Sequence, residues 1–236
     1  METSIIQQIK KRAGNFIEPQ FLKTGRVLDV RAWQPDHIIE IDLHLPAVDM
    51  TLWNEVPYIK FRVDNLTFRD YTPAGWDAET CTCTLFINTA HNGPGTTWAR
   101  SLTKNDSVYY LKIDTTRQKP DHTSLVVGLG DETSIGHLLA LQQLTLPVTR
   151  FTGAVLMSDA QHPVLFSEYF RSPLHGLLRQ EADACQTLFN WVLAQGYCIQ
   201  HTVFCLTGKH HMVANLRKLL KQQGYSSSQI QVKGFW

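Results

Sequence analysis

The spacing of apolar residues changes midway along this 236-residue chain, and that change constrains the fold more than any other feature. From about residue 23 to residue 113, apolar side chains tend to fall at every second position, as in IEIDLHL at 39–45. Such alternation is typical of half-buried strands. The same character continues at 58–63, 81–87 and 108–113. Short strands separated by Pro, Gly, Asn and Asp predict a small antiparallel β-barrel.

Beyond residue 123 the apolar residues form short continuous runs that alternate with helical patterns. The strand-like runs occupy 124–128, 151–157, 202–206 and 230–232. Between them, apolar residues spaced three and four apart predict helices over 135–144, 181–195 and 212–220. Strands that alternate with helices predict a parallel sheet with crossover helices.

The segment between the two halves, TTRQKPD at 115–121, is polar and contains proline, as linkers do. We therefore expect an antiparallel β-barrel domain over residues 1–117, followed by a parallel-sheet α/β domain over residues 118–236. A chain of this length can form one large domain or two small ones, each with its own core.

The charge balance excludes some classes of partner. Twenty-two Lys and Arg residues oppose 21 Asp and Glu residues, which leaves a net charge of +1. An extended nucleic-acid surface needs an excess of basic residues, so we expect no nucleic-acid partner. No stretch approaches the roughly 20 apolar residues of a spanning helix, so we expect no membrane insertion. Residues 1–16 lack the apolar core of a signal peptide.

Neither the cysteines nor the histidines have the spacing of a metal site. The five cysteines include Cys81 and Cys83, which would share one face of a strand and could not easily bridge each other. We interpret all five as reduced thiols of a cytoplasmic protein. The ten histidines form no HExxH motif and no Cys/His cluster, so no metal site is predicted.

The first candidate motif is Arg69-Asp70-Tyr71-Thr72, at the end of a strand-rich stretch. Alternation along a strand places Arg69 and Tyr71 on one side, with Thr72 at its end. A cation for phosphates, a flat aromatic face and a hydroxyl are then close together, which suits a flavin nucleotide. On these residues alone, a strand with a solvated arginine and a packed tyrosine is the simpler interpretation.

The second candidate motif is the segment HNGPGTTWA at 91–99, which follows a predicted strand. Its two glycines allow the backbone to approach a ligand closely, and Thr96 and Thr97 suit the first turn of a short helix. The free N–H groups of such a turn form an anion site. The alternative is a Gly-Pro turn into a capped helix, with Trp98 as a core residue.

Four motifs in order give the chain a specific resemblance. They are Arg69-Asp70-Tyr71-Thr72, the segment 91–99, Gly130-Asp131-Glu132-Thr133 and Gly234-Phe235-Trp236. The chain resembles the siderophore-interacting protein family of flavin-dependent ferric reductases, which carry R-x-Y-T, an H-x-x-G-P-A-S-x-W-A-like segment, G-D-E-T and G-Y-W in that order. The resemblance runs from about residue 26 to residue 236.

The resemblance implies an FAD-binding barrel, an α/β domain that receives NADPH or NADH, and site residues in both. Arg69 would contact the FAD phosphates, Tyr71 would pack on the flavin, and Thr72 would reach its N5 edge. The implied cofactor-binding residues are Arg69, Asp70, Tyr71, Thr72, His91, Gly93, Gly95, Thr96, Thr97, Trp98, Asp131, Glu132, Thr133, Phe235 and Trp236. Thr72 and Thr133 are the implied catalytic positions. Plain helix capping is the alternative for 131–133, and sealing of the domain seam is the alternative for the terminal aromatics.

The resemblance also implies a reaction. NAD(P)H would reduce FAD, and the flavin would pass electrons to ferric iron in a siderophore, whose oxygen ligands hold ferrous iron less well. Ferric siderophores are often anionic, so Lys209 and Lys233 are expected to bind the substrate, beside His210 and His211. The alternative is that these four residues are solvated surface residues. We expect the protein to act as a monomer.

The chain departs from the family pattern in several places. Lys209 stands in Thr207-Gly208-Lys209 where the family has an acidic residue, and Gly95 stands where the family tends to have alanine. The altered Thr207-Gly208-Lys209 turn leaves an FAD-binding carrier or sensor as an alternative, and a flavin reductase with another electron acceptor is a further one. Asp159, after the strand at 151–157, favours NADH if it binds the ribose, but it is equally suited to a turn.

Overall fold

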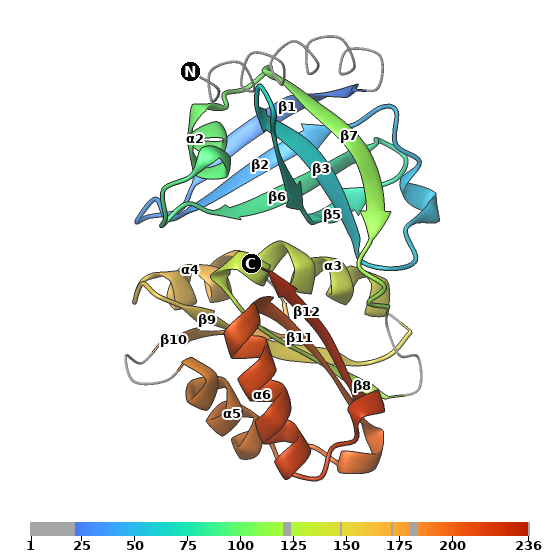
Figure 1. Cartoon of the computed structure of the whole chain (residues 1–236), viewed down its shortest axis with the longest axis vertical. Helices are drawn as coiled ribbons and strands as arrows, with labels where there is room; N and C mark the ends of the chain where they lie inside the picture. Colours follow the sequence, from blue (N-terminus) through green and yellow to red (C-terminus); the bar gives the residue numbers. More distant parts are fainter. Residues whose placement is uncertain (1–21, 120–123, 147, 171, 180–183, 236) are drawn as a thin grey trace, which may run out of the picture.

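The computed structural model describes residues 22–119, 124–146, 148–170, 172–179 and 184–235 (Figure 1). Predictions for Trp236 and for the first residues of the 181–195 helix lie outside the described residues. Two sheets are stacked along the long axis of the molecule, the antiparallel one first in the sequence (Figure 1). The division into domains at residue 117 stays a prediction.

The antiparallel sheet has seven strands in the order β4-β3-β7-β1-β2-β6-β5. They are β1 (Lys23–Ala32), β2 (Ile38–His44), β3 (Pro57–Asp64), β4 (Thr67–Tyr71), β5 (Pro73–Asp77), β6 (Thr82–Asn88) and β7 (Ser107–Thr115). The sheet is barrel-like but not closed, because its edge strands β4 and β5 do not pair with each other. These two strands are consecutive, so Thr72 alone joins the two open edges.

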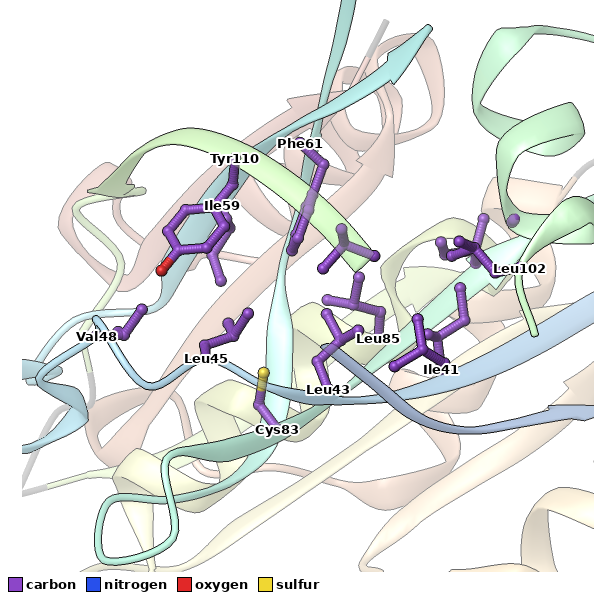
Figure 2. Close-up of a cluster of buried hydrophobic side chains, with 14 of the residues drawn as sticks. Ile41, Leu43, Leu45, Val48, Ile59, Phe61, Cys83, Leu85, Leu102 and Tyr110 are labelled. Carbon is purple, nitrogen blue, oxygen red and sulfur yellow. The ribbon is translucent and has the colours of Figure 1, made fainter. Parts of the chain in front are cut away.

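Alternation produces the core of this sheet, as the sequence predicts. Along β3 the apolar residues Ile59, Phe61 and Val63 are buried, while the residues between them are partly exposed. They meet residues of β2, β6 and β7, and Figure 2 shows Ile41, Leu43, Leu85 and Tyr110 among the side chains of this cluster. Helix α2 (Pro94–Ser101) adds Ala99 to the same core. Period-two burial on one face therefore sets the register of the sheet.

The parallel sheet has five strands in the order β10-β9-β8-β11-β12. They are β8 (Leu125–Asp131), β9 (Phe151–Met157), β10 (Leu174–Leu178), β11 (Thr202–Lys209) and β12 (Ile230–Phe235). The chain builds outward from β8 in one direction and then returns to its other side with β11. That reversal creates a crevice at the carboxyl ends of the strands, where ligands bind in open α/β sheets.

Helices cover both faces of the parallel sheet (Figure 1). They are α3 (Ile135–Thr145), α4 (His162–Tyr169), α5 (Ala184–Gln195) and α6 (His210–Gln222). Short 3₁₀ helices lie at Glu132–Ser134, Ile199–His201 and Ser227–Gln229 in this half, and at Met50–Leu52 between β2 and β3. Helices α5 and α6 pack on the far face, while α3 and α4 lie between the two sheets. Ile135 and Leu138 of α3 share a core with Ile38 and Ala74 of the antiparallel sheet. This shared core holds the two sheets in a fixed relation.

The predicted fold is confirmed, with small differences. Cys81 was expected in a strand, but β6 begins at Thr82 and Cys81 has a φ of 54° in the preceding turn. The positive φ ends the strand pattern there. Within the described ranges, no helix is long and apolar enough to cross a bilayer.

Candidate functional site

A cavity of about 860 Å³ lies between the two sheets and is lined by residues of both. Its size is within the range of sites that hold small molecules and cofactors. The predicted residues that line it are Arg69, Asp70, Tyr71, Thr72, His91, Gly93, Gly95, Thr96, Asp131, Glu132, Thr133, Lys209, Lys233 and Phe235. Thr97 and Trp98 do not line it, although both belong to α2. The four motifs are thus brought to one place.

The antiparallel sheet contributes the edge strand β4 to the cavity. Arg69 is partly buried, and its Nη1 donates a hydrogen bond to the carbonyl of Phe68 at 2.8 Å. Asp70 is exposed and forms an ion pair of 2.6 Å with Lys60 on β3. The ammonium group of Lys60 is thus paired with Asp70. Arg69 is the cation of this edge that is placed to meet an anion.

Tyr71 is held in a fixed position by an aromatic neighbour. Its ring stacks on Trp98, with 5.7 Å between ring centroids and 12° between the planes. Burial raises the pKa of the Tyr71 hydroxyl to about 12, against the opposing effect of Arg69. Gly95 makes this position possible, because a Cβ there would lie 2.3 Å from the Tyr71 hydroxyl oxygen.

Replacing Gly95 by alanine is expected to destabilise the protein by about 1–3 kcal/mol, because overpacking displaces Tyr71 from Trp98. Gly93→Ala is the matched control, since a Cβ at residue 93 would meet no atom within 4 Å. Denaturant unfolding measures both. The additional change Tyr71→Phe removes the hydroxyl and should restore most of the stability lost in Gly95→Ala. Equal effects of the two glycine replacements would contradict the contact.

Helix α2 presents its amino end to the same cavity. Pro94 is the first helical residue, so the N–H groups of Gly95 and Thr96 have no acceptor within the helix. The threonine hydroxyls are used locally: Thr96 donates to the carbonyl of His91 at 2.7 Å and Thr97 to that of Gly93 at 3.2 Å. The groups placed to meet an anion are therefore backbone N–H groups, and Gly93 leaves open space in front of them.

The parallel sheet faces the cavity with its carboxyl edge. Across the sheet from β10 to β12, the lining residues at or just beyond the strand ends are Arg179, Ser158, Asp131, Lys209 and Phe235. All five strands thus contribute to the site. The sequence places a polar or aromatic residue after each apolar run, and the parallel arrangement brings these residues into one row.

Asp131 caps the turn after β8, as the alternative interpretation of this motif expected. Its Oδ1 accepts hydrogen bonds from the backbone N–H and the hydroxyl of Thr133, at 3.0 and 2.5 Å. Its Oδ2 accepts from the backbone N–H of Lys209 at 3.2 Å. Asp131 is almost fully buried, so its carboxylate joins β8 to β11 and orients Thr133.

Glu132 joins the two sheets. Its Oε2 accepts a hydrogen bond of 2.6 Å from the side-chain amide of Asn88, the last residue of β6. Its Oε1 accepts a hydrogen bond from the backbone N–H of Ser158, just after β9. Only 6% of Glu132 is exposed. The same carboxylate therefore contacts both walls of the cavity.

A second contact between the walls involves Gly136 in the first turn of α3. A Cβ at this position would lie 2.9 Å from the carbonyl oxygen of Thr72. The absence of a side chain lets α3 approach the connection between β4 and β5. Thr72 and Thr133, the two implied catalytic positions, both line the cavity beside this contact.

His137 and Lys233 form the end of the cavity near the linker. His137 is fully buried, and its Nε2 is hydrogen bonded to Oε1 of Gln118. Burial and, to a lesser extent, the charge of Lys233 lower the pKa of His137 to about 3, so its imidazole is neutral at physiological pH. The ammonium group of Lys233 lies over the ring of Tyr58, 5.5 Å from its centroid. With the imidazole neutral, Lys233 supplies positive charge at this end of the site.

The sequence motifs did not include several lining residues, chiefly Asn88, Ser158, Arg179 and His137. Asn88, Ser158 and Arg179 share one signal that could have found them, which is their position at the end of a strand. His137 and Gln118 carry no comparable local signal, because their contact depends on how the linker meets α3.

Comparisons with known proteins agree with this architecture. No protein-family model and no curated protein match the chain. Among solved structures, a ferredoxin reductase of carbazole 1,9a-dioxygenase is 13% identical, with a TM-score of 0.73 over 91% of this chain and 69% of that chain. The chain thus has the two-sheet fold of ferredoxin-reductase-like proteins, which confirms the predicted fold class.

Siderophore-interacting proteins share the same fold over nearly their whole length. The one from Acinetobacter baumannii is 13% identical, with a TM-score of 0.68 over 91% of this chain and 90% of that chain. A siderophore utilization protein from T. fusca is 19% identical, with a TM-score of 0.68 over 91% and 92%. These structures confirm, at the level of the fold, the resemblance that the four motifs indicate.

Proposed function

We propose that this protein is a flavin-dependent oxidoreductase that transfers electrons from NAD(P)H through FAD to ferric iron in a siderophore. One observation carries the proposal: a single cavity joins the Arg69–Tyr71 edge of one sheet to the carboxyl ends of all five strands of the other. Two nucleotides can meet there, each against the kind of surface that suits it. The fold shared with siderophore proteins and a ferredoxin reductase supports the proposal.

The residues present fit FAD. A dinucleotide needs a cation and N–H groups for its pyrophosphate, an aromatic surface for its ring system, and space for the backbone to approach. Arg69, the amino end of α2, Tyr71 and the open face of Gly93 supply these four features. Arg69 and Tyr71 lie on the same edge strand, so the phosphate and ring contacts are next to each other.

When bound, FAD would supply the redox chemistry, and the protein residues would position the reactants. Thr72 lies between the two edge strands, where its hydroxyl can donate to the edge of the flavin ring. The hydroxyl of Thr133 donates to Asp131, which leaves its oxygen as an acceptor at the donor strand ends. The close contact of Gly136 with Thr72 excludes water from the space between α3 and this edge.

The donor in this proposal is NADPH, because of Arg179. In nucleotide-binding sheets an acidic residue near the second strand recognises the free ribose of NADH, whereas an arginine accommodates the 2′-phosphate of NADPH. Asp159, the acidic candidate, accepts a hydrogen bond of 2.8 Å from the backbone N–H of Gln161, as a turn residue does. Arg179 lines the cavity beside Ser158, and its buried Nε has no hydrogen-bond partner in the described part of the chain.

Replacing Arg179 by alanine is expected to raise the KM for NADPH about 10- to 100-fold and to leave that for NADH unchanged, because only NADPH carries the phosphate. Steady-state kinetics with both nucleotides measure the difference. Arg150→Ala is the matched control, because Arg150 is exposed and lies just before β9, at the amino ends of the strands and away from the cavity. A similar rise in both KM values would argue against recognition of a phosphate by Arg179.

The proposed iron-chelate site is at the lysine end of the cavity. Lys209 and Lys233 both line it, whereas His210 and His211 are exposed and do not. An anionic ferric chelate would be attracted to two lysines beside a neutral histidine. The cytoplasmic location and the monomeric state stay predictions.

Trapping of ferrous iron tests the whole reaction. FAD-loaded protein, NADPH and a ferric hydroxamate are mixed without oxygen, and a ferrous-specific chelator reports the product. We expect iron release that depends on protein, FAD and nucleotide together. A flavin that is reduced but gives no ferrous iron would favour another acceptor. A bound flavin that neither nucleotide reduces would favour the carrier or sensor.

A further inference from the structure

We propose that Glu132 is a positioning residue that sets the geometry between FAD and the electron donor, by joining the loop after β6 to the end of β9. This inference rests on the proposed function and assigns Glu132 a role other than direct contact with a cofactor. Both of its carboxylate oxygens are already engaged by protein groups, one on each wall of the cavity.

On the antiparallel side, the bond reaches the loop that leads into α2. Asn88 donates to Glu132 with its amide nitrogen and accepts with its Oδ1 from the backbone N–H of Ala90 at 3.1 Å. The next residues of this loop, His91 to Gly93, line the cavity and end at the amino end of α2. A hydrogen-bonded chain from Glu132 through Asn88 to Ala90 therefore orients the proposed phosphate loop.

On the parallel side, the bond reaches the proposed donor strands. Ser158 follows β9 directly, and the backbone N–H of Arg179, just after the neighbouring strand β10, donates to the carbonyl of Met157 at 2.8 Å. Ser158 and Arg179 are thus adjacent along the carboxyl edge. The carboxylate that orients the FAD loop also fixes the backbone of the donor site.

Stability alone does not account for this arrangement. Glu132 is buried, and its two donors in the described part of the chain are uncharged, an amide and a backbone N–H group. A buried carboxylate with uncharged donors loses its hydration without the attraction of a counter-ion. Two oxygens that accept in opposite directions do give a defined span between two backbones. The Glu132 carboxylate is therefore suited to hold these two backbones at a fixed distance.

The test uses Glu132→Gln, which keeps the shape but replaces one accepting oxygen by a donating NH2 group. One of the two bonds is then lost, so the FAD loop and the donor strand can move apart. Because small displacements in a reacting pair cost about 10- to 100-fold in rate, we expect a fall of that size in flavin reduction at saturating NADPH. FAD affinity should change less than about threefold, since the phosphate contacts remain.

A second variant reverses the polarity of the bond and should rescue it. In Asn88→Asp/Glu132→Gln, the new glutamine amide donates to the new aspartate, while its oxygen still accepts from Ser158. The aspartate also still accepts from Ala90, so all three bonds are restored and the total charge is unchanged. Asn88→Asp alone places two carboxylates together and should be the most impaired variant. Glu168→Gln, an exposed residue of α4, is the control.

Three readouts are compared for each variant: the FAD dissociation constant, the rate of anaerobic flavin reduction, and the long-wavelength absorbance that a reduced flavin stacked on NADP⁺ produces. The inference expects the last two to fall in Glu132→Gln and to recover in the double variant. Suppose that the FAD of the wild-type protein is reduced normally. This inference alone is then wrong if Glu132→Gln reduces its flavin at the wild-type rate, or if the double variant stays as slow as Glu132→Gln. A wild-type protein that binds no FAD, or whose FAD neither nucleotide reduces, overturns the proposed function and this inference with it.

Discussion

Replacing Arg69 by alanine is expected to weaken FAD binding about 10- to 100-fold, because charge-assisted hydrogen bonds to the pyrophosphate are lost. Arg69 lines the cavity on β4, and within the described residues only its Nη1 is engaged, with the carbonyl of Phe68. The rest of the guanidinium group is placed to meet an anion at the amino end of α2. Quenching of FAD fluorescence on titration with protein measures the dissociation constant.

Two further variants show whether the arginine acts as a fork or as a simple charge. Arg69→Lys keeps the charge without the paired donors, so an intermediate affinity is expected. Arg26→Ala removes an exposed arginine from β1, outside the cavity lining, and should leave FAD affinity unchanged. Equal affinities for wild type and Arg69→Ala would mean that FAD is held elsewhere or not at all.

Replacing Arg31 by alanine is expected to lower the free energy of unfolding by about 2–3 kcal/mol, the largest stability effect that the ion pairs predict. Arg31 binds Glu40 at 2.9 Å and Asp42 at 2.6 Å, and Glu40 is almost fully buried. Without the guanidinium group, the buried carboxylate of Glu40 keeps Trp33 as its one side-chain donor among the residues that the structure describes. Denaturant unfolding measures the change, and Arg26→Ala in the same strand should cost less than about 0.5 kcal/mol.

The effect of Arg31 should depend on pH. Burial acts to raise the pKa of Asp42, but hydrogen bonds from Arg31 and Thr84 outweigh it, so this pKa is below its ordinary value. A lowered pKa in the folded state gives stability that is present above the unfolded value of about 3.9 and lost as the pH falls. The difference between wild type and Arg31→Ala should therefore be full above about pH 5 and should shrink below about pH 4. A difference that grew in acid would contradict this.

The sequence predicted most of the fold because two clear periods were present. The run at 151–157 corresponds to β9 (Phe151–Met157) residue for residue, because a short, mostly apolar run between polar residues is typical of a strand buried in a parallel sheet. In contrast, β10 (Leu174–Leu178) was not predicted, because His175 and Gly176 interrupt a run of five residues. Pairing with β9 makes it a strand, and pairing between distant segments is not visible in local sequence.

Site residues could be predicted where a short motif contains the chemical groups that a ligand needs. They could not be predicted where contacts between the two sheets determine which residues line the cavity. Arg69 and Tyr71 followed from alternation along a single strand. Asn88 and Ser158 matter because Glu132 reaches both, across a space that only the packed structure defines. Of the two interpretations of Asp159, the structure agrees with the turn residue, because its carboxylate accepts a hydrogen bond from the backbone N–H two residues later.

The central claim is that NADPH reduces FAD bound in the cavity between the two sheets. The most direct measurement is the visible spectrum of the FAD-loaded protein, recorded without oxygen before and after NADPH is added, in wild type and in Arg179→Ala. We predict rapid loss of the oxidised-flavin bands in wild type, slower loss in the variant, and recovery of the bands when a ferric hydroxamate is added. A protein that binds no FAD, or whose flavin bands persist with both NADPH and NADH, would contradict the claim.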